Sequence, residues 1–168
     1  MHSIALITTY IGRLPWYFPY FLHSCRYNPS IDFIILSDNI ITSMELPSNV
    51  KLIHYTIDQF KADATKALEF EVVVGHGYKL CDFKPAYGCI FKNLIKGYDF
   101  WGYCDIDIIF GNIRNFMTCE ILNEYDVISA RHDYLTGCFA LYRNNIEMRE
   151  LFKESKDYIR IFTSSENF

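Results

Sequence analysis

Residues 78–114 read YKLCDFKPAYGCIFKNLIKGYDFWGYCDIDIIFGNIR and carry two aspartates, Asp105 and Asp107, inside an apolar and aromatic run. The part from Phe100 to Phe110 is short for a helix and rich in aromatic and β-branched residues, so we expect a buried strand there. Residues two apart on a strand point to the same face, with roughly 7 Å between their Cα atoms. Two carboxylates on one buried face are unfavourable without a cation between them. A divalent cation with oxygen ligands would satisfy both.

The Asp-x-Asp triplet has little weight by itself, because such a triplet is common by chance and usually belongs to a solvated loop. Two features of its surroundings favour a functional interpretation. Apolar residues flank it on both sides, and Gly111 follows where a strand would end. The sequence therefore makes this pair the leading candidate for a binding site.

Length and composition limit the class of protein. At 168 residues and 51% hydrophobic, the chain is long enough for one domain with a substantial core. The net charge of -4 gives no basic face, so we do not expect nucleic acid as a partner. Aromatic residues make up 17% of the chain. Most should fill the core, but aromatic rings also form the platforms on which sugars and nucleobases lie.

The cysteines and the N-terminus bear on the compartment. The six cysteines form no CxxC pair and have no histidine at a zinc-binding spacing, and the N-terminus lacks the pattern of a secretory signal. We therefore expect reduced thiols in a cytoplasmic protein. No apolar run has the length of a membrane span, and peripheral association with the inner face of a membrane stays open.

The first half of the chain alternates between strand and helix patterns, which predicts an α/β, mainly parallel, doubly wound sheet flanked by helices. Ligands in such sheets lie at the carboxyl ends of the strands, where we expect Thr8, Thr9, Tyr10, Asp38 and the end of the Asp105 strand. The expected strands are 3–10, 31–37 and 50–55, and the expected helices are 16–27 and 56–70, the second capped by Thr56 or Asp58.

The second half predicts further helices and strands. A helix from Pro85 to about Lys96 would have Asp82 as its cap. Lys79 and Lys84 beside that helix start would suit a diphosphate, or would be solvated. The glycines of VVVGHGY do not form the dinucleotide fingerprint. We also expect a short helix within 113–122, strands at 126–130 and 138–142, and a final helix 146–159 that buries Ile146, Leu151, Phe152 and Ile159.

Three strings carry a resemblance that spans Tyr78 to Asn145: YKLCDFKPAYG, YDFWGYCDIDIIFGNIRNF and TGCFALYRNN. They resemble a bacterial glycosyltransferase family with the GT-A fold, of the kind linked to capsular and cell-surface polysaccharide synthesis. The resemblance implies transfer of a sugar from a nucleotide-diphosphate donor to a saccharide or lipid-linked acceptor. It also implies an Mn²⁺ or Mg²⁺ ion at the Asp-x-Asp motif, where a Lewis acid stabilises the departing diphosphate.

The resemblance also assigns roles to individual residues. Asp107 would bind the metal, and Asp105 would hold either the metal or hydroxyls of the donor. Asp82 and Lys84 would lie beside the nucleotide. The remaining assignments place Thr9 and Tyr10 at the nucleobase and let Gly137 bring a strand close to the sugar.

Two departures from the family qualify the resemblance. Cys138 stands where the family often has His, and no residue is assigned as catalytic. Members of the family are also longer, so we expect this single domain, residues 1–168, to be incomplete at its C-terminal end.

Two other functions stay open. A phosphotransferase would use Asp105 as its nucleophile, although such enzymes usually carry the motif on the first strand. A non-catalytic remnant or partner subunit would keep the nucleotide and metal pocket without turnover. Donor binding without transfer would mark this last alternative.

Overall fold

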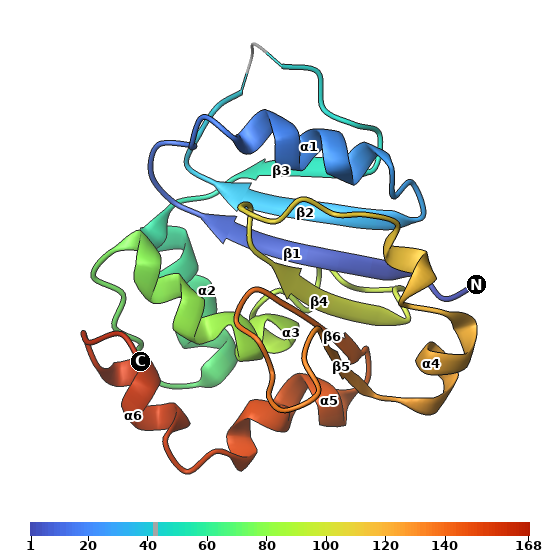
Figure 1. Ribbon diagram of the computed structural model, residues 1–168. Helices are drawn as coiled ribbons and strands as arrows, with labels where there is room; N and C mark the ends of the chain where they lie inside the picture. The colour runs from blue at the N-terminus through green and yellow to red at the C-terminus, as the bar shows by residue number, and fades with distance from the viewer. Residues whose placement is uncertain (42–43) are drawn as a thin grey trace.

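The computed structural model describes residues 1–41 and 44–168 and consists of one six-stranded sheet with helices on both faces (Figure 1). The strands are β1 (Ile4–Tyr10), β2 (Ile31–Ser37), β3 (Val50–His54), β4 (Phe100–Cys104), β5 (Val127–Ser129) and β6 (Phe139–Arg143). The helices are α1 (Phe18–Arg26), α2 (Ile57–Leu68), α3 (Tyr87–Ile90), α4 (Cys119–Glu124), α5 (Ile146–Glu150) and α6 (Tyr158–Thr163). Three 3₁₀ segments complete the described elements: η1 (Gly77–Ala86), η2 (Ile113–Asn115) and η3 (Leu151–Glu154).

The strand order is β3-β2-β1-β4-β6-β5. Strands β3, β2, β1 and β4 are parallel, whereas β6 runs antiparallel to β4 and β5 antiparallel to β6. The expected α/β class, with a mixed and mainly parallel sheet, is therefore confirmed. After β1 the chain builds outward through β2 and β3, and then returns to place β4 on the other side of β1. The carboxyl ends of β1 and β4 thus form the topological switch point at which ligands of such sheets bind.

Two hydrophobic cores lie on opposite faces of the sheet. Ala5 and Ile7 of β1 point into the core beneath α2, α3, α5 and α6, while Ile4 and Leu6 point into the core beneath α1 and α4. Because alternate side chains on a strand face opposite ways, a strand buried on both faces is apolar throughout. This explains the nearly continuous apolar runs of β1 and β2, and Figure 1 shows the helices covering both faces.

Several local predictions are confirmed. Helix α1 begins at Phe18 with Pro19 in its first turn, where a missing N–H costs nothing. Thr56 caps α2 and forms a capping box with Gln59, since each side chain accepts a hydrogen bond from the backbone N–H of the other. Strand β3 lies at the edge of the sheet.

The predicted strand from Phe100 to Phe110 is wrong in its second half. Strand β4 ends at Cys104, and residues 106–107 form a turn. The physical reason is the length of its neighbours: β6 pairs with β4 only from Phe100 to Cys104, and β1 only up to Tyr103. Beyond that point a strand would have no ladder partner, so Asp105 and Asp107 leave the sheet at its carboxyl edge.

Two predicted helices are also corrected. The helix expected from Pro85 to Lys96 is reduced to the single turn α3, Pro85 lies inside η1, and Asp82 caps no helix. The helix expected at 146–159 is broken into α5, η3 and α6. Here Phe152 and Phe162 are both buried, whereas the expected core residues Ile146 and Ile159 are exposed. Because residues ten apart face different directions on a continuous helix, the break lets both phenylalanines reach the core.

None of the helices in the two described ranges is both long and apolar enough to cross a bilayer.

Candidate functional site

Lys84 joins three segments at the carboxyl edge of the sheet. Its ammonium group forms an ion pair with Oδ1 of Asp105, just past β4, and donates a hydrogen bond to the carbonyl of Gly137, just before β6, at 2.7 Å. The Lys84 side chain is 8% exposed and the Asp105 side chain 35%. The lysine is therefore buried while its aspartate partner stays partly open to solvent, and a charge interaction there is stronger than on an open surface.

The end of β1 is held beside this pair. The Tyr87 hydroxyl donates to the carbonyl of Leu80 at 3.1 Å, so its oxygen accepts the hydrogen of the Thr9 hydroxyl. The Thr8 hydroxyl donates to the carbonyl of Cys104 at 2.6 Å and ties β1 to the end of β4. Tyr10 is partly exposed, and its hydroxyl donates to the carbonyl of Arg13 at 3.3 Å. Thr9 and Tyr10 thus lie at the switch point with β4, as the sequence predicted.

Asp107 is exposed in the turn that follows β4. The pKa of the Tyr17 hydroxyl is raised, first by desolvation and then by the charge of Asp107, by Tyr10 and by the charge of Asp105. Tyr17 therefore lies within electrostatic reach of both carboxylates of the motif. The two aspartates do not share a strand face, and they follow each other within two residues at the carboxyl edge of the sheet, just past β4.

The carboxylates suit a hard divalent cation in the chemistry of their donor atoms. Mg²⁺ is commonly held by one or two carboxylates together with substrate phosphates. Asp105 and Asp107 supply two carboxylates, and Lys84 engages only Oδ1 of Asp105. Within residues 1–41 and 44–168, no group of three or more His, Cys, Asp or Glu side chains is arranged to hold a metal ion. A cation here would thus need additional oxygens from a ligand or water.

Asp82 has a different partner from the one its sequence position suggested. Its carboxylate accepts a hydrogen bond from Lys79 at 2.9 Å and one from the backbone N–H of Phe168 at 3.3 Å. Lys79 is fully buried, so it is not a surface lysine available to a diphosphate. Asp82 still contributes, with Lys84, Gly137 and Phe168, to the lining of a hollow of about 400 Å³.

Gly137 lies outside β6, in the loop that leads into the strand. An added Cβ there would meet nothing within 4 Å, so the space above it is open. The loop is anchored below by the Tyr103 hydroxyl, which donates to the carbonyl of Thr136 at 3.0 Å. Cys138 follows Gly137 and is exposed.

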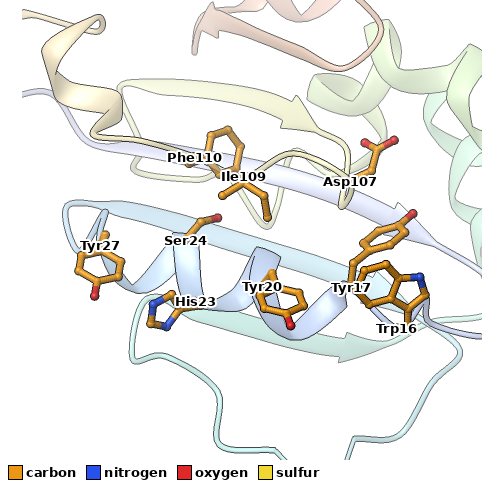
Figure 2. A pocket seen from close by; sticks show the side chains of 9 residues that line it. All are labelled: Trp16, Tyr17, Tyr20, His23, Ser24, Tyr27, Asp107, Ile109 and Phe110. Carbon is orange, nitrogen blue, oxygen red and sulfur yellow. The ribbon is translucent and has the colours of Figure 1, made fainter.

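A second hollow, which the sequence reasoning missed, runs along α1 and reaches Asp107. It has a volume of about 570 Å³ and is lined mainly by aromatic side chains of α1 and of the turn before it (Figure 2). Figure 2 shows Trp16 and Tyr17 near Asp107 at one end and Tyr27 at the other. The spacing of Trp16, Tyr20 and Tyr27 could have revealed it, since these residues share one helix face, opposite to the buried Phe18, Phe21 and Cys25.

The chain was compared with known proteins and structures. No curated protein matches it. Among solved structures, the apo form of the glycosyltransferase GlyE from Streptococcus pneumoniae TIGR4 is similar with a TM-score of 0.43 and 12% sequence identity, over 91% of this chain and 36% of that one. The chain thus spans little more than a third of that structure, and a likeness this low carries no argument about activity. A model described as a family of unknown function, DUF6625, matches residues 6–168, so the chain belongs to that family.

Proposed function

We propose that the chain is a metal-dependent glycosyltransferase domain that binds a nucleotide-diphosphate sugar at the carboxyl ends of β1 and β4. The acceptor would be a saccharide or a lipid-linked saccharide, and the proposed setting is surface polysaccharide synthesis on the cytoplasmic side of the membrane. One observation carries the proposal: Asp105 with its Lys84 partner and the exposed Asp107 lie together at the topological switch point of the sheet.

The charges at this edge suit a nucleoside diphosphate. A cation held by Asp105 and Asp107 would supply Lewis-acid stabilisation to the diphosphate as the glycosidic bond breaks. A fixed positive group would add to this stabilisation, and the buried Lys84 ammonium is held in place by its hydrogen bond to the Gly137 carbonyl. Groups that are already oriented stabilise developing charge without reorganisation.

The neighbouring residues have complementary proposed roles. Thr9 and Tyr10 at the end of β1 would contact the nucleoside, and the open space above Gly137 would accommodate the sugar. Asp82 would contribute indirectly, because its ion pair with Lys79 holds the η1 segment that carries Lys84 in position. No residue is proposed as a general base.

The first test is thermal unfolding with UDP, GDP, ADP or CDP, each with and without Mn²⁺ or Mg²⁺. At a ligand concentration about 100 times Kd, binding to the folded state adds about 2.7 kcal/mol, which raises Tm by roughly 5–10 °C for a chain of this length. We expect one nucleotide to give this rise only in the presence of the metal. If no nucleotide gives metal-linked stabilisation, the proposed function is wrong.

Asp107→Asn is expected to remove the metal-linked rise while leaving the Tm of the unliganded protein within about 2 °C of wild type, since exposed side chains contribute little to stability. Asp107 is a cleaner choice than Asp105, whose loss would leave the buried Lys84 ammonium without its charged partner. Differential scanning fluorimetry of both proteins with the same nucleotide and metal series measures the effect.

Glu147→Gln is the matched control. Glu147 is also exposed, but it lies in the first turn of α5, after β6 has returned to the opposite edge of the sheet. This variant should keep the full metal-linked rise. Equal loss in both variants would mean that general surface charge, and not a site at Asp107, couples the metal to the nucleotide. Nucleotide-sugar binding without hydrolysis or transfer to any acceptor would instead identify the non-catalytic alternative.

A further inference from the structure

The hollow along α1 has a lining that the donor site does not account for. Its side chains are large, aromatic and open to solvent: Trp16 is 81% exposed, Tyr20 59% and Tyr27 68%. Large exposed aromatic side chains gathered in one place are uncommon on a soluble protein and usually mark a binding surface. Helix α1 needs none of them for its core contact, because Phe18, Phe21, Leu22 and Cys25 fill its buried face.

The aromatic rings of this groove are held in fixed orientations. Trp16 contacts Tyr20 edge to face, with ring centroids 6.1 Å apart and planes at 84°, and His23 contacts Tyr27 in the same way at 5.1 Å and 78°. In this geometry the edge of one ring meets the face of the other, which is a favourable arrangement. The row from Tyr20 to Tyr27 extends roughly 10 Å along the helix axis. The groove is therefore an ordered platform longer than a single sugar ring.

The polar groups of the groove indicate which ligand it suits. Hydroxyl groups come from Tyr17, Tyr20, Tyr27 and Ser24, and Asp107 lines one end, with its carboxylate pointing away from the aromatic rings in Figure 2. None of the described residues that line it is a lysine or an arginine. A phosphorylated ligand would leave its charge unpaired there, whereas a neutral polyol finds aromatic faces and hydroxyl partners together.

We propose that the α1 groove binds a neutral pyranose saccharide and is the acceptor subsite. The assignment as acceptor rests on the proposed function above; the binding of sugar does not. The position of Asp107 connects the two sites, because the residue whose carboxylate would hold the cation of the donor also lines the end of the groove. A saccharide lying on Trp16, Tyr20 and Tyr27 would thus present one end toward the donor.

Tryptophan fluorescence can test this directly, because the chain has two tryptophans in opposite environments. Trp16 is exposed in the groove, whereas Trp101 is 0% exposed and stacked on Tyr142 at 4.5 Å. Titration with cellobiose, lactose, maltose and chitobiose, without nucleotide or metal, should give a saturable change in emission for at least one disaccharide. The change should vanish in Trp16→Phe, which identifies its source.

Tyr20→Ala should weaken the same binding roughly fivefold to tenfold, the loss expected for one aromatic contact. Tyr125→Ala is the matched control, since Tyr125 is half exposed but lies after α4, away from the groove, and this variant should bind as wild type does. Circular dichroism of each variant establishes that it is folded.

Three outcomes would overturn the proposal. No response to any of the four disaccharides would do so, as would equal weakening by Tyr20→Ala and Tyr125→Ala. The third is a blue shift of the Trp16 emission with phosphatidylcholine and phosphatidylglycerol vesicles and no change with sugars, which would identify α1 as a membrane-facing helix. Loss of sugar binding alongside intact metal-linked nucleotide stabilisation would remove only this proposal. Sugar binding without stabilisation by any nucleotide would support the groove as a saccharide site and contradict the proposed function, and with it the assignment as acceptor subsite.

Discussion

A Lys79→Met variant is expected to unfold with a free energy about 3–5 kcal/mol lower than wild type, because it breaks a buried ion pair by removing one partner. The Lys79 ammonium donates to Oδ2 of Asp82 at 2.9 Å, to the carbonyl of Ile161 at 2.8 Å and to the carbonyl of Glu166. An ammonium group has three donors, and these three contacts use all of them. Methionine fills a similar volume but satisfies none of the three acceptors.

The cost arises mainly from what Lys79→Met leaves behind. The Asp82 side chain is 6% exposed, so its charge would stay buried with only the backbone N–H of Phe168 as a donor. Two carbonyls of the C-terminal segment would lose their donor as well, and α6 would keep its stacking contact between Phe162 and Phe83 of η1 but lose its hydrogen bond to that segment. Urea unfolding followed by circular dichroism measures the loss, and for a chain of this length we expect Tm to fall by roughly 10 °C.

Lys61→Met is the matched control. Lys61 also pairs with an aspartate three residues away, Asp58, but at 3.9 Å and with side chains 41% and 92% exposed. Exposed pairs of this kind contribute less than about 1 kcal/mol. Adding Asp82→Asn to Lys79→Met should recover roughly 1 kcal/mol or more relative to the sum of the single changes, because the orphaned charge is then gone. A cost for Lys79→Met no larger than that for Lys61→Met would contradict the role given to this pair.

The parts of the fold that the sequence predicted are those fixed by local chemistry. The apolar runs of β1 and β2 indicate burial on both faces, and the cap at Thr56, one of the two predicted candidates, is a local contact at the start of α2. The alternation of strand and helix was sufficient for the α/β class. None of these depends on residues far away in the chain.

The failures come from contacts between distant segments. The end of β4 is set by where β6 begins, some 35 residues later, so composition alone extended the strand too far. The burial of Lys79 could not be predicted from the local sequence either, because the backbone carbonyls that accept its hydrogen bonds are 82 and 87 residues away. The final helix was overestimated because its periodicity did not reveal that Phe152 and Phe162 both reach the core.

The candidate site was predicted in part. The strings around Lys84 and Asp105 marked residues that do meet in space, although 21 positions separate them. The sequence placed the two aspartates on a strand face, whereas Asp105 follows the end of β4 and is partly exposed, and Asp107 lies in the turn at 106–107 and is exposed. The aromatic row of α1 was overlooked because aromatic residues occupy both faces of that helix and conceal its polarity.

A Gly102→Ala variant tests how β4 is positioned to carry the aspartates, and we expect it to lose about 3 kcal/mol of stability. A Cβ at Gly102 would lie 2.2 Å from the carbonyl oxygen of Ala140, 2.7 Å from Leu141 Cδ2 and 3.1 Å from Leu6 Cδ2. The first of these atoms belongs to the backbone of β6, so a side-chain rotation cannot relieve the clash. Gly102 pairs with Leu6 on one side and Leu141 on the other, in the middle of the sheet.

Relief of this clash would require β4 and β6 to separate, which would weaken the ladder that ends at the Asp105 N–H and the Cys138 carbonyl, now 3.0 Å apart. Gly102→Ala should therefore lower both the free energy of unfolding, measured in urea, and the affinity for the nucleotide and metal. Gly75→Ala is the control, because an added Cβ there meets nothing within 4 Å, and its stability should stay within about 1 kcal/mol of wild type. If Gly102→Ala were as stable as Gly75→Ala, the close approach of β4 and β6 would not be what places Asp105 beside Lys84.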